Sequence, residues 1–192
     1  FDKVILAIPP AQATALLNAS GLSALATPLN GVHVDPCWTL MLAYPQAVQP
    51  DLITLGPQWN AARSTHHRIA WMARESSKPG RERIERWTVQ ASAPWSAEHV
   101  NDSPERITGK LIKAFAEITG IRATPAHAEA HRWLYAKTAQ PLGQSFLWSK
   151  AQGIGMCGDW CLGHRAEDAF VSGLELALAV LQKRCSPMAL GY

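Results

Sequence analysis

A short apolar strand pattern followed by a long apolar helix pattern lies near the C-terminal end of this 192-residue chain. The strand pattern covers residues 153–159 and ends in Gly158-Asp159, and the helix pattern covers residues 165–183 after a short loop. The predicted apolar stripe of this helix consists of Ala169, Phe170, Gly173, Leu174, Ala177, Val180 and Leu181. A strand, a tight loop and a helix in this order predict an α/β unit.

The pair Gly158-Asp159 has the chemistry of a ligand contact. Glycine lets a bulky ligand approach the backbone, and an aspartate at the carboxyl end of a strand accepts hydrogen bonds from sugar or ribityl hydroxyls. The helix that follows offers free N–H groups to an anion. The alternative is that Asp159 only caps the turn, and the spacing does not choose between the two. We interpret the G-x-G-x-x-G pattern at residues 153–158 as unrelated to a first dinucleotide loop, because the helix begins several residues later.

The rest of the chain predicts an α+β fold with an antiparallel sheet. Residues 3–8 predict a strand buried on both faces, which Pro9-Pro10 ends. Further strands are expected at residues 38–44, 68–73, 85–90, 131–137 and 145–148, and helices at residues 11–17 and from Ser103 to Gly120. Pro79-Gly80 predicts a hairpin between the strands at 68–73 and 85–90.

Composition argues against several classes of protein. A net charge of +3, without a run of basic residues, does not favour a nucleic-acid partner, and no apolar run approaches the length of a membrane span. The four cysteines are irregularly spaced in a chain too long to depend on disulfides, which predicts a reducing, cytoplasmic setting. We interpret Cys157 and Cys161 as ordinary buried or partly buried thiols and predict no metal site. The histidines are expected to be surface or structural residues.

Three separated motifs resemble those of a known family. In chain order they are Phe1 to Pro9, His131-Arg132-Trp133-Leu134-Tyr135-Ala136, and Gly158-Asp159-Trp160-Cys161 with Glu167 to Gly173. In this order they resemble the renalase-like, flavin-containing amine oxidase family, over almost the whole chain. The sequence departs from the family pattern at Asp168, where the family usually has glycine, and this places a carboxylate close to the expected flavin contact.

The resemblance implies that the chain is the C-terminal portion of an FAD-dependent oxidoreductase and lacks the N-terminal half with the dinucleotide-binding motif. Residues 1–10 would then be a strand of the FAD domain, 11–150 the substrate domain, 151–185 the C-terminal FAD-binding segment, and 186–192 a tail. The expected fold is an antiparallel-sheet substrate domain with helices, plus a strand–turn–helix that returns to an α/β domain that binds FAD.

The resemblance also implies roles for individual residues. FAD would contact Gly158, Asp159 and the backbone N–H groups of Ala169 and Phe170, and the substrate pocket would include Trp133 and Tyr135. The alternative for the two aromatic residues is core packing, since aromatic side chains favour strands. No catalytic residue is identified, because in flavin chemistry the cofactor performs the difficult step.

The predicted reaction is hydride transfer from an amine or a dihydronicotinamide-type substrate to FAD, with oxygen as the acceptor. The isolated chain is expected to be inactive and to bind FAD weakly, because the missing half supplies the adenine and pyrophosphate contacts. The alternative function is a non-catalytic α+β domain that binds a ligand or a partner. The Gly158-Asp159 loop distinguishes the two hypotheses, because a plain binding sheet does not require it.

Overall fold

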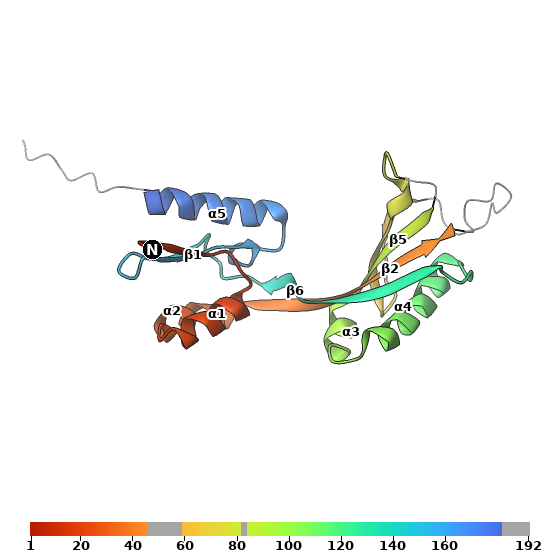
Figure 1. The fold of residues 1–192 in the computed structure, drawn as a ribbon, viewed down its shortest axis with the longest axis horizontal. Coiled ribbons are helices and arrows are strands. Elements are labelled where there is room, and N and C mark those ends of the chain that lie inside the picture. The colour runs from red at the N-terminus through yellow and green to blue at the C-terminus, as the bar shows by residue number, and fades with distance from the viewer. Residues whose placement is uncertain (46–58, 82–83, 182–192) are drawn as a thin grey trace, which may run out of the picture. The chain divides into compact units, whose positions relative to one another are not determined.

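The computed structural model of the chain describes residues 1–45, 59–81 and 84–181. The predicted tail at 186–192 and Cys185 lie outside these residues. The chain divides into two compact units (Figure 1), which we call unit 1 (Phe1–Val34 with the described residues from Lys137 onward) and unit 2 (Asp35–Ala136). Among the described residues, no helix has the length and apolar character needed to cross a bilayer.

Unit 2 is built on a five-stranded sheet of order β3-β4-β5-β2-β6. The strands are β2 (His33–Tyr44), β3 (Ala61–Arg63), β4 (Ile69–Arg74), β5 (Glu85–Ala91) and β6 (His127–Gln140); β2 and β6 also extend into the residues of unit 1. The pairs β2/β5, β3/β4 and β4/β5 are antiparallel. The predicted hairpin is therefore confirmed as β4 and β5, with a short 3-10 turn (Glu75–Ser77) after β4. The prediction of an α+β fold with an antiparallel sheet is confirmed at this level.

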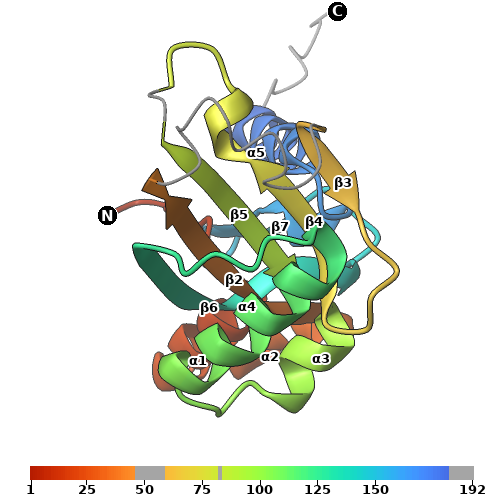
Figure 2. The same cartoon turned by 90° about the vertical axis from the view of Figure 1, so that its right-hand side faces the viewer.

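Helices α3 (Ala93–Glu98) and α4 (Pro104–Thr119) cover one face of this sheet (Figure 2). The Ser103 hydroxyl accepts a hydrogen bond from the N–H of Arg106, and Gly120 ends α4 at φ 78°, so both predicted signals act as expected. The buried face of α4 and the alternating apolar residues of β2 belong to one hydrophobic core. The residues of these two elements in this core are Ile107, Leu111 and Phe115 on α4 and Trp38, Leu40, Leu42 and Tyr44 on β2.

Unit 1 contains a three-stranded sheet of order β1-β8-β7. Strands β1 (Val4–Leu6) and β8 (Ile154–Met156) are parallel, and β7 (Leu147–Ser149) is antiparallel to β8. The helical elements of this unit are α1 (Pro10–Ala19), α2 (Ser23–Ala26), the 3-10 turns Thr27–Gly31 and Asp159–Cys161, and α5 (Ala166–Leu181). A core of Leu6, Ala13, Leu17, Ala26, Leu29, Met156, Trp160 and Cys161 joins the sheet to α1 and α2.

Residues 11–34 and 137–150 group with unit 1. Ala13, Leu17 and Leu29 bury their side chains in one core with Leu6 and Met156. The assignment of residues 11–150 to a substrate domain stays a prediction.

The strand at residues 3–8 forms as predicted but is not buried on both faces. Val4 and Ile5 are each 44% exposed, and only Leu6 is buried. The reason is positional, since among the described residues β1 has a neighbouring strand, β8, on one side only.

Candidate functional site

The parallel strands β1 and β8 end at the same edge of the unit 1 sheet, and the Gly158-Asp159 loop follows at this edge. The N–H of Cys157 donates to the Leu6 carbonyl (3.3 Å), and the chain then turns through Asp159–Cys161 toward α5. Ligands of open α/β sheets bind just beyond the carboxyl ends of parallel strands. The loop therefore occupies the position where such a fold places a ligand.

Gly158 is required by the space around it. Its backbone is extended (φ 162°, ψ 172°), a conformation open to any residue, but a Cβ here would come within 2.4 Å of Trp160 Nε1. Trp160 is buried, and its indole N–H donates to the Ile8 carbonyl (3.1 Å), so this side chain has no room to move. The Trp160 indole therefore fixes the loop and leaves no space for a side chain at residue 158.

Ser172 of α5 holds the same loop from the other side. Its fully buried hydroxyl accepts a hydrogen bond from the Gly158 N–H (2.9 Å). Burial raises the pKa of the Cys161 thiol to about 11, although a hydrogen bond with Ser172 opposes this rise. Burial also raises the pKa of Cys157. Both thiols are therefore neutral at pH 7, and the prediction that they are ordinary buried thiols is confirmed. Sequence reasoning missed the role of Ser172, because a serine inside an apolar helix gives no local signal.

Asp159 makes the turn with its main chain. Its carbonyl accepts hydrogen bonds from the N–H groups of Leu162 (2.9 Å) and Gly163 (2.8 Å). Its partly exposed carboxylate has no hydrogen-bond partner in the part of the chain that the structure describes. The main chain of Asp159 therefore shapes the turn, and the role of its carboxylate stays a prediction.

Asp168, the residue that departs from the family pattern, points back into the loop. One carboxylate oxygen accepts from the N–H groups of both His164 (3.0 Å) and Arg165 (2.9 Å). Gly163 makes room for it, because a Cβ at residue 163 would lie 2.5 Å from this oxygen. The carboxylate therefore occupies the two backbone donors that directly precede α5.

The expected N–H contact at Ala169 is not available. Its N–H donates to the Arg165 carbonyl (3.3 Å) within the first turn of α5, and Phe170 lies one residue deeper in the same helix. The N–H groups left free at a helix start are those of its first residues, here Ala166 and Glu167. The Phe170 side chain is 70% exposed. Any contact of these two residues with a cofactor must therefore use their side chains.

The two aromatic residues of the predicted substrate pocket belong to β6. Trp133 is 53% and Tyr135 40% exposed, and the Trp133 ring meets His131 edge-on at 4.4 Å between ring centroids. Neither side chain belongs to the core that the described residues form. The structure therefore does not support the alternative that these two residues pack in the core. Among the predicted tryptophan core positions, Trp38 and Trp87 are buried, whereas Trp71 and Trp148 are only partly buried.

Among the described residues of unit 2, some line cavities that the sequence did not indicate. One, of about 490 Å³, is lined by Trp59, Ala62, Arg63, Met72, Ile118 and Thr119, among others. The second, of about 370 Å³, is lined by Trp38, Asp102, Pro104, Ala130, His131 and Arg132. Neither lining includes Trp133 or Tyr135.

Asp102, at the second cavity, is surrounded by positive charge. Its carboxylate lies 3.1 Å from Lys110 Nζ, 3.5 Å from Arg106 Nε and 3.8 Å from His99 Nδ1. The hydrogen bond from Lys110 holds the pKa of this carboxyl below its usual value, and the charges of Arg106 and His99 act in the same direction. The Asp102 carboxylate is therefore one member of a structural cluster of ion pairs and is not available as a base.

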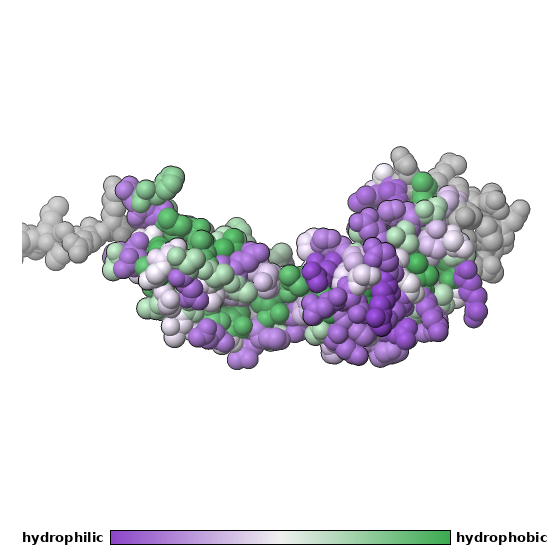
Figure 3. Space-filling model, turned by 60° about the horizontal axis from the view of Figure 1, so that its bottom comes forward, coloured by the Kyte–Doolittle hydropathy of each residue, from purple (hydrophilic) through white to green (hydrophobic). Residues whose placement is uncertain are grey.

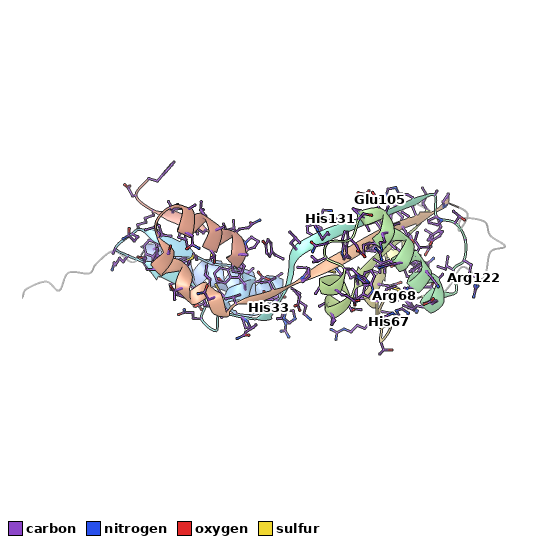
Figure 4. The ribbon with its side chains drawn as sticks, turned by 90° about the horizontal axis from the view of Figure 1, so that it is seen from below. His33, His67, Arg68, Glu105, Arg122 and His131 are labelled. Atoms are coloured by element: carbon purple, nitrogen blue, oxygen red, sulfur yellow. The ribbon has the colours of Figure 1, made fainter. Side chains whose placement is uncertain are left out.

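The three histidines labelled in Figure 4, His33, His67 and His131, come from different elements or loops. His67 precedes β4 and accepts from Arg68 Nε (3.1 Å), whereas His131 lies on β6. No group of three or more His, Cys, Asp or Glu side chains suited to a metal ion occurs at residues 1–45, 59–81 or 84–181.

Comparison with solved structures identifies proteins that share this fold. A protein from Exiguobacterium sp., provisionally named a protoporphyrinogen oxidase, has a TM-score of 0.70 at 17% identity over 95% of this chain. Cyclohexylamine oxidase from Brevibacterium oxydans has a TM-score of 0.62 at 11% identity over 93%. A cofactor-binding variant of putrescine oxidase has a TM-score of 0.60 at 12% identity over 94%. No family model matches the chain.

These similarities establish the fold of the chain and show how much of each solved structure the chain covers. The chain shares the fold of part of these three oxidases, and it spans only 42%, 42% and 43% of their lengths. The expected resemblance is thus confirmed at the level of fold.

Proposed function

We propose that this chain is the C-terminal portion of an FAD-dependent oxidoreductase that transfers a hydride from an amine or a dihydronicotinamide-type substrate to the flavin, with oxygen as the acceptor. The observation that carries the proposal is the Gly158-Asp159 loop at the carboxyl ends of β1 and β8, where the Asp159 carboxylate has no hydrogen-bond partner among the described residues. The fold shared with flavin oxidases supports it. A non-catalytic binding domain would need no such loop.

The loop fits the hydroxyl-bearing part of FAD better than the phosphates. The Asp159 carboxylate is partly exposed and accepts hydrogen bonds from hydroxyls. The carboxylates of Glu167 and Asp168 in the first turn of α5 repel a phosphate group, and the Asp168 carboxylate already occupies two backbone donors. We therefore assign the ribityl chain, rather than the pyrophosphate, to Asp159.

In this assignment, bound FAD supplies the hydride acceptor, and the residues of this chain supply binding and orientation. Ser172 and Trp160 hold Gly158 and Asp159 in position, so the carboxylate is oriented before the cofactor binds. Trp133 and Tyr135, two residues apart on β6, present neighbouring aromatic rings to the substrate. An aromatic face attracts a cationic amine and also stacks on a planar nicotinamide ring, so either substrate class fits.

The isolated chain binds FAD weakly in this account, because the adenine and pyrophosphate contacts belong to an N-terminal βαβ half. We place the protein in the cytoplasm, because Cys37, Cys157 and Cys161 are free thiols. Its partners are a small-molecule substrate and the N-terminal half, with no nucleic-acid or membrane partner.

Anaerobic reduction of the flavin tests the function. The full-length natural gene product is purified, and its spectrum is recorded before and after addition of a panel of primary amines and of dihydronicotinamide nucleotides. We expect a yellow protein whose 450 nm band bleaches with one of the two substrate classes and returns when oxygen is admitted. A colourless protein that takes up no added FAD would favour the non-catalytic alternative.

A further inference from the structure

A small cavity opens where the loop between α3 and α4 meets strand β6 of unit 2. Its volume is about 370 Å³, and small-molecule sites begin at about 300 Å³. Trp38, Pro104 and Ala130 form the apolar part of its lining, and Asp102, His131 and Arg132 form the polar part. An apolar lining with a few polar groups is the usual composition of a ligand pocket. The function proposed above uses none of these residues.

Arg132 is held in one orientation at the wall of this cavity. Its guanidinium carbon lies 5.9 Å from the centroid of the Trp38 ring, and its Nη1 donates to the Val100 carbonyl (2.5 Å). Trp38 is buried, and its indole N–H donates to the His99 carbonyl (3.0 Å), so the ring gives the guanidinium a fixed support. A guanidinium has five N–H donors. Since the Val100 carbonyl takes one of them, further donors remain for a ligand.

The positive charge of Arg132 has no carboxylate partner in the part of the chain that the structure describes. Asp102, which also lines the cavity, already lies 3.1 Å from Lys110 Nζ and 3.5 Å from Arg106 Nε. Glu105, in the first turn of α4, has a lowered pKa because its carboxylate accepts a hydrogen bond from its own backbone N–H. The charge without a counter-ion at this cavity is therefore positive, and it favours an anionic ligand.

A carboxylate suits this cavity better than a phosphate. A guanidinium binds both groups through paired N–H···O bonds. Asp102 faces the same cavity, however, so a second negative charge on the ligand would be repelled. Pro104 and Ala130 give the ligand an apolar wall, whereas the surface of unit 2 on the side of α3 and α4 is largely hydrophilic (Figure 3). These features favour a small ligand with one carboxylate and a short apolar body that ends within the cavity.

We propose that this cavity binds a small organic monocarboxylate, whose carboxylate pairs with the Arg132 guanidinium and whose apolar body lies against Pro104 and Ala130. The site is separate from the proposed substrate pocket, because successive residues of a strand point to opposite faces of the sheet. Arg132 points to the face that carries Trp38, so Trp133 points to the other face. Binding at this cavity does not depend on flavin binding, and the two proposals can fail separately.

Calorimetry on the full-length natural gene product tests this site. The probes are acetate, butyrate, benzoate and phenylacetate, with benzamide as the neutral counterpart of benzoate and inorganic phosphate as the alternative anion. We expect at least one of the larger carboxylates to bind with a dissociation constant of about 1 mM or lower, and acetate, benzamide and phosphate to bind more weakly. Absence of binding by every carboxylate up to about 10 mM would overturn the proposal. Benzamide or phosphate that bound as tightly as the best carboxylate would also overturn it.

Matched variants locate the bound carboxylate. Arg132→Gln removes the charge-assisted hydrogen bonds and should weaken binding on the order of tenfold to a hundredfold. Arg132→Lys keeps the charge but not the paired donors, and it should weaken binding less. Arg122→Gln is the control and should leave binding unchanged, because Arg122 is an exposed arginine of the same unit outside the cavity lining (Figure 4).

The same titrations can refute the site. Unchanged affinity in the Arg132 variants would do so, and melts of each variant show whether it is folded; Arg132→Lys provides the comparison if Arg132→Gln does not fold. Loss of binding in Tyr135→Ala, with binding unchanged in Arg132→Gln, would put the carboxylate in the proposed substrate pocket and refute the proposal. Binding that depends on Arg132 in a full-length protein that takes up no FAD would refute the proposed function but keep this site.

Discussion

Substitution of Gly158 by alanine tests whether the loop is packed as tightly as the structure shows. The new Cβ would lie 2.4 Å from Trp160 Nε1 and 2.6 Å from its Cδ1, closer than the 3.0 Å below which real Cβ contacts essentially never occur. The indole must move within a packed core, and overpacking of this kind costs about 1–3 kcal/mol. Loss of the hydrogen bond from Trp160 to the Ile8 carbonyl adds about 0.5–1.5 kcal/mol.

The expected loss of unfolding free energy is therefore about 1.5–4.5 kcal/mol, which for a chain of this size lowers the melting temperature by roughly 3–18 °C. Urea unfolding followed by tryptophan fluorescence measures it. Gly173→Ala is the matched control, because a Cβ at this helical position meets nothing within 4 Å and should stabilise the chain by about 0.5–1 kcal/mol. If Gly158→Ala unfolded at the same urea concentration as the parent chain, the packing argument would be refuted.

Three further predictions follow from single contacts. Ser172→Ala leaves the Gly158 N–H without its acceptor and should cost about 1–3 kcal/mol in urea unfolding, and an unchanged midpoint would contradict this. The folded-state pKa of Asp102 is lowered, chiefly by Lys110, so its stabilisation is present above the ordinary aspartate pKa and is lost as the pH falls through the lowered value. Asp102→Asn should thus be less stable than the parent at pH 7 and approach it in acid; a difference that grows in acid would show the opposite linkage. Trp133→Ala in the full-length enzyme should change KM or kcat, whereas a lower melting temperature with unchanged kinetics would indicate a packing role.

Local sequence signals were sufficient where an element carries its own boundaries and one buried face. Helix α4 begins at the Ser103 cap and ends at Gly120 as predicted, because these signals depend on neighbours within one turn. The alternation from Trp38 to Tyr44 identified the buried face of β2 in the same way.

Sequence signals failed where the outcome depends on residues distant in the chain. Periodicity showed that α5 has an apolar stripe but not which side the sheet covers, because Leu176 and Ser172 meet β8 and the following loop through tertiary contacts. The return of the Asp168 carboxylate to the loop depends on the absence of a side chain at Gly163, which no periodicity reports. For the same reason the sequence placed Asp159 at a strand end but could not tell a ligand-binding carboxylate from a cap.

FAD titration of the full-length protein tests the central claim, that the Gly158-Asp159 loop binds the cofactor of an oxidoreductase. Calorimetry or flavin fluorescence is used on the flavin-free parent, on Asp159→Ala and on Asp159→Asn, together with melts of the three flavin-free proteins. A charge-assisted hydrogen bond contributes about 1.5–3 kcal/mol, so Asp159→Ala should bind FAD roughly tenfold to a hundredfold more weakly, and Asp159→Asn, which keeps one acceptor, should lose less. Equal FAD affinity in all three proteins, with lower melting temperatures in the two variants, would instead show that Asp159 only shapes the turn into α5.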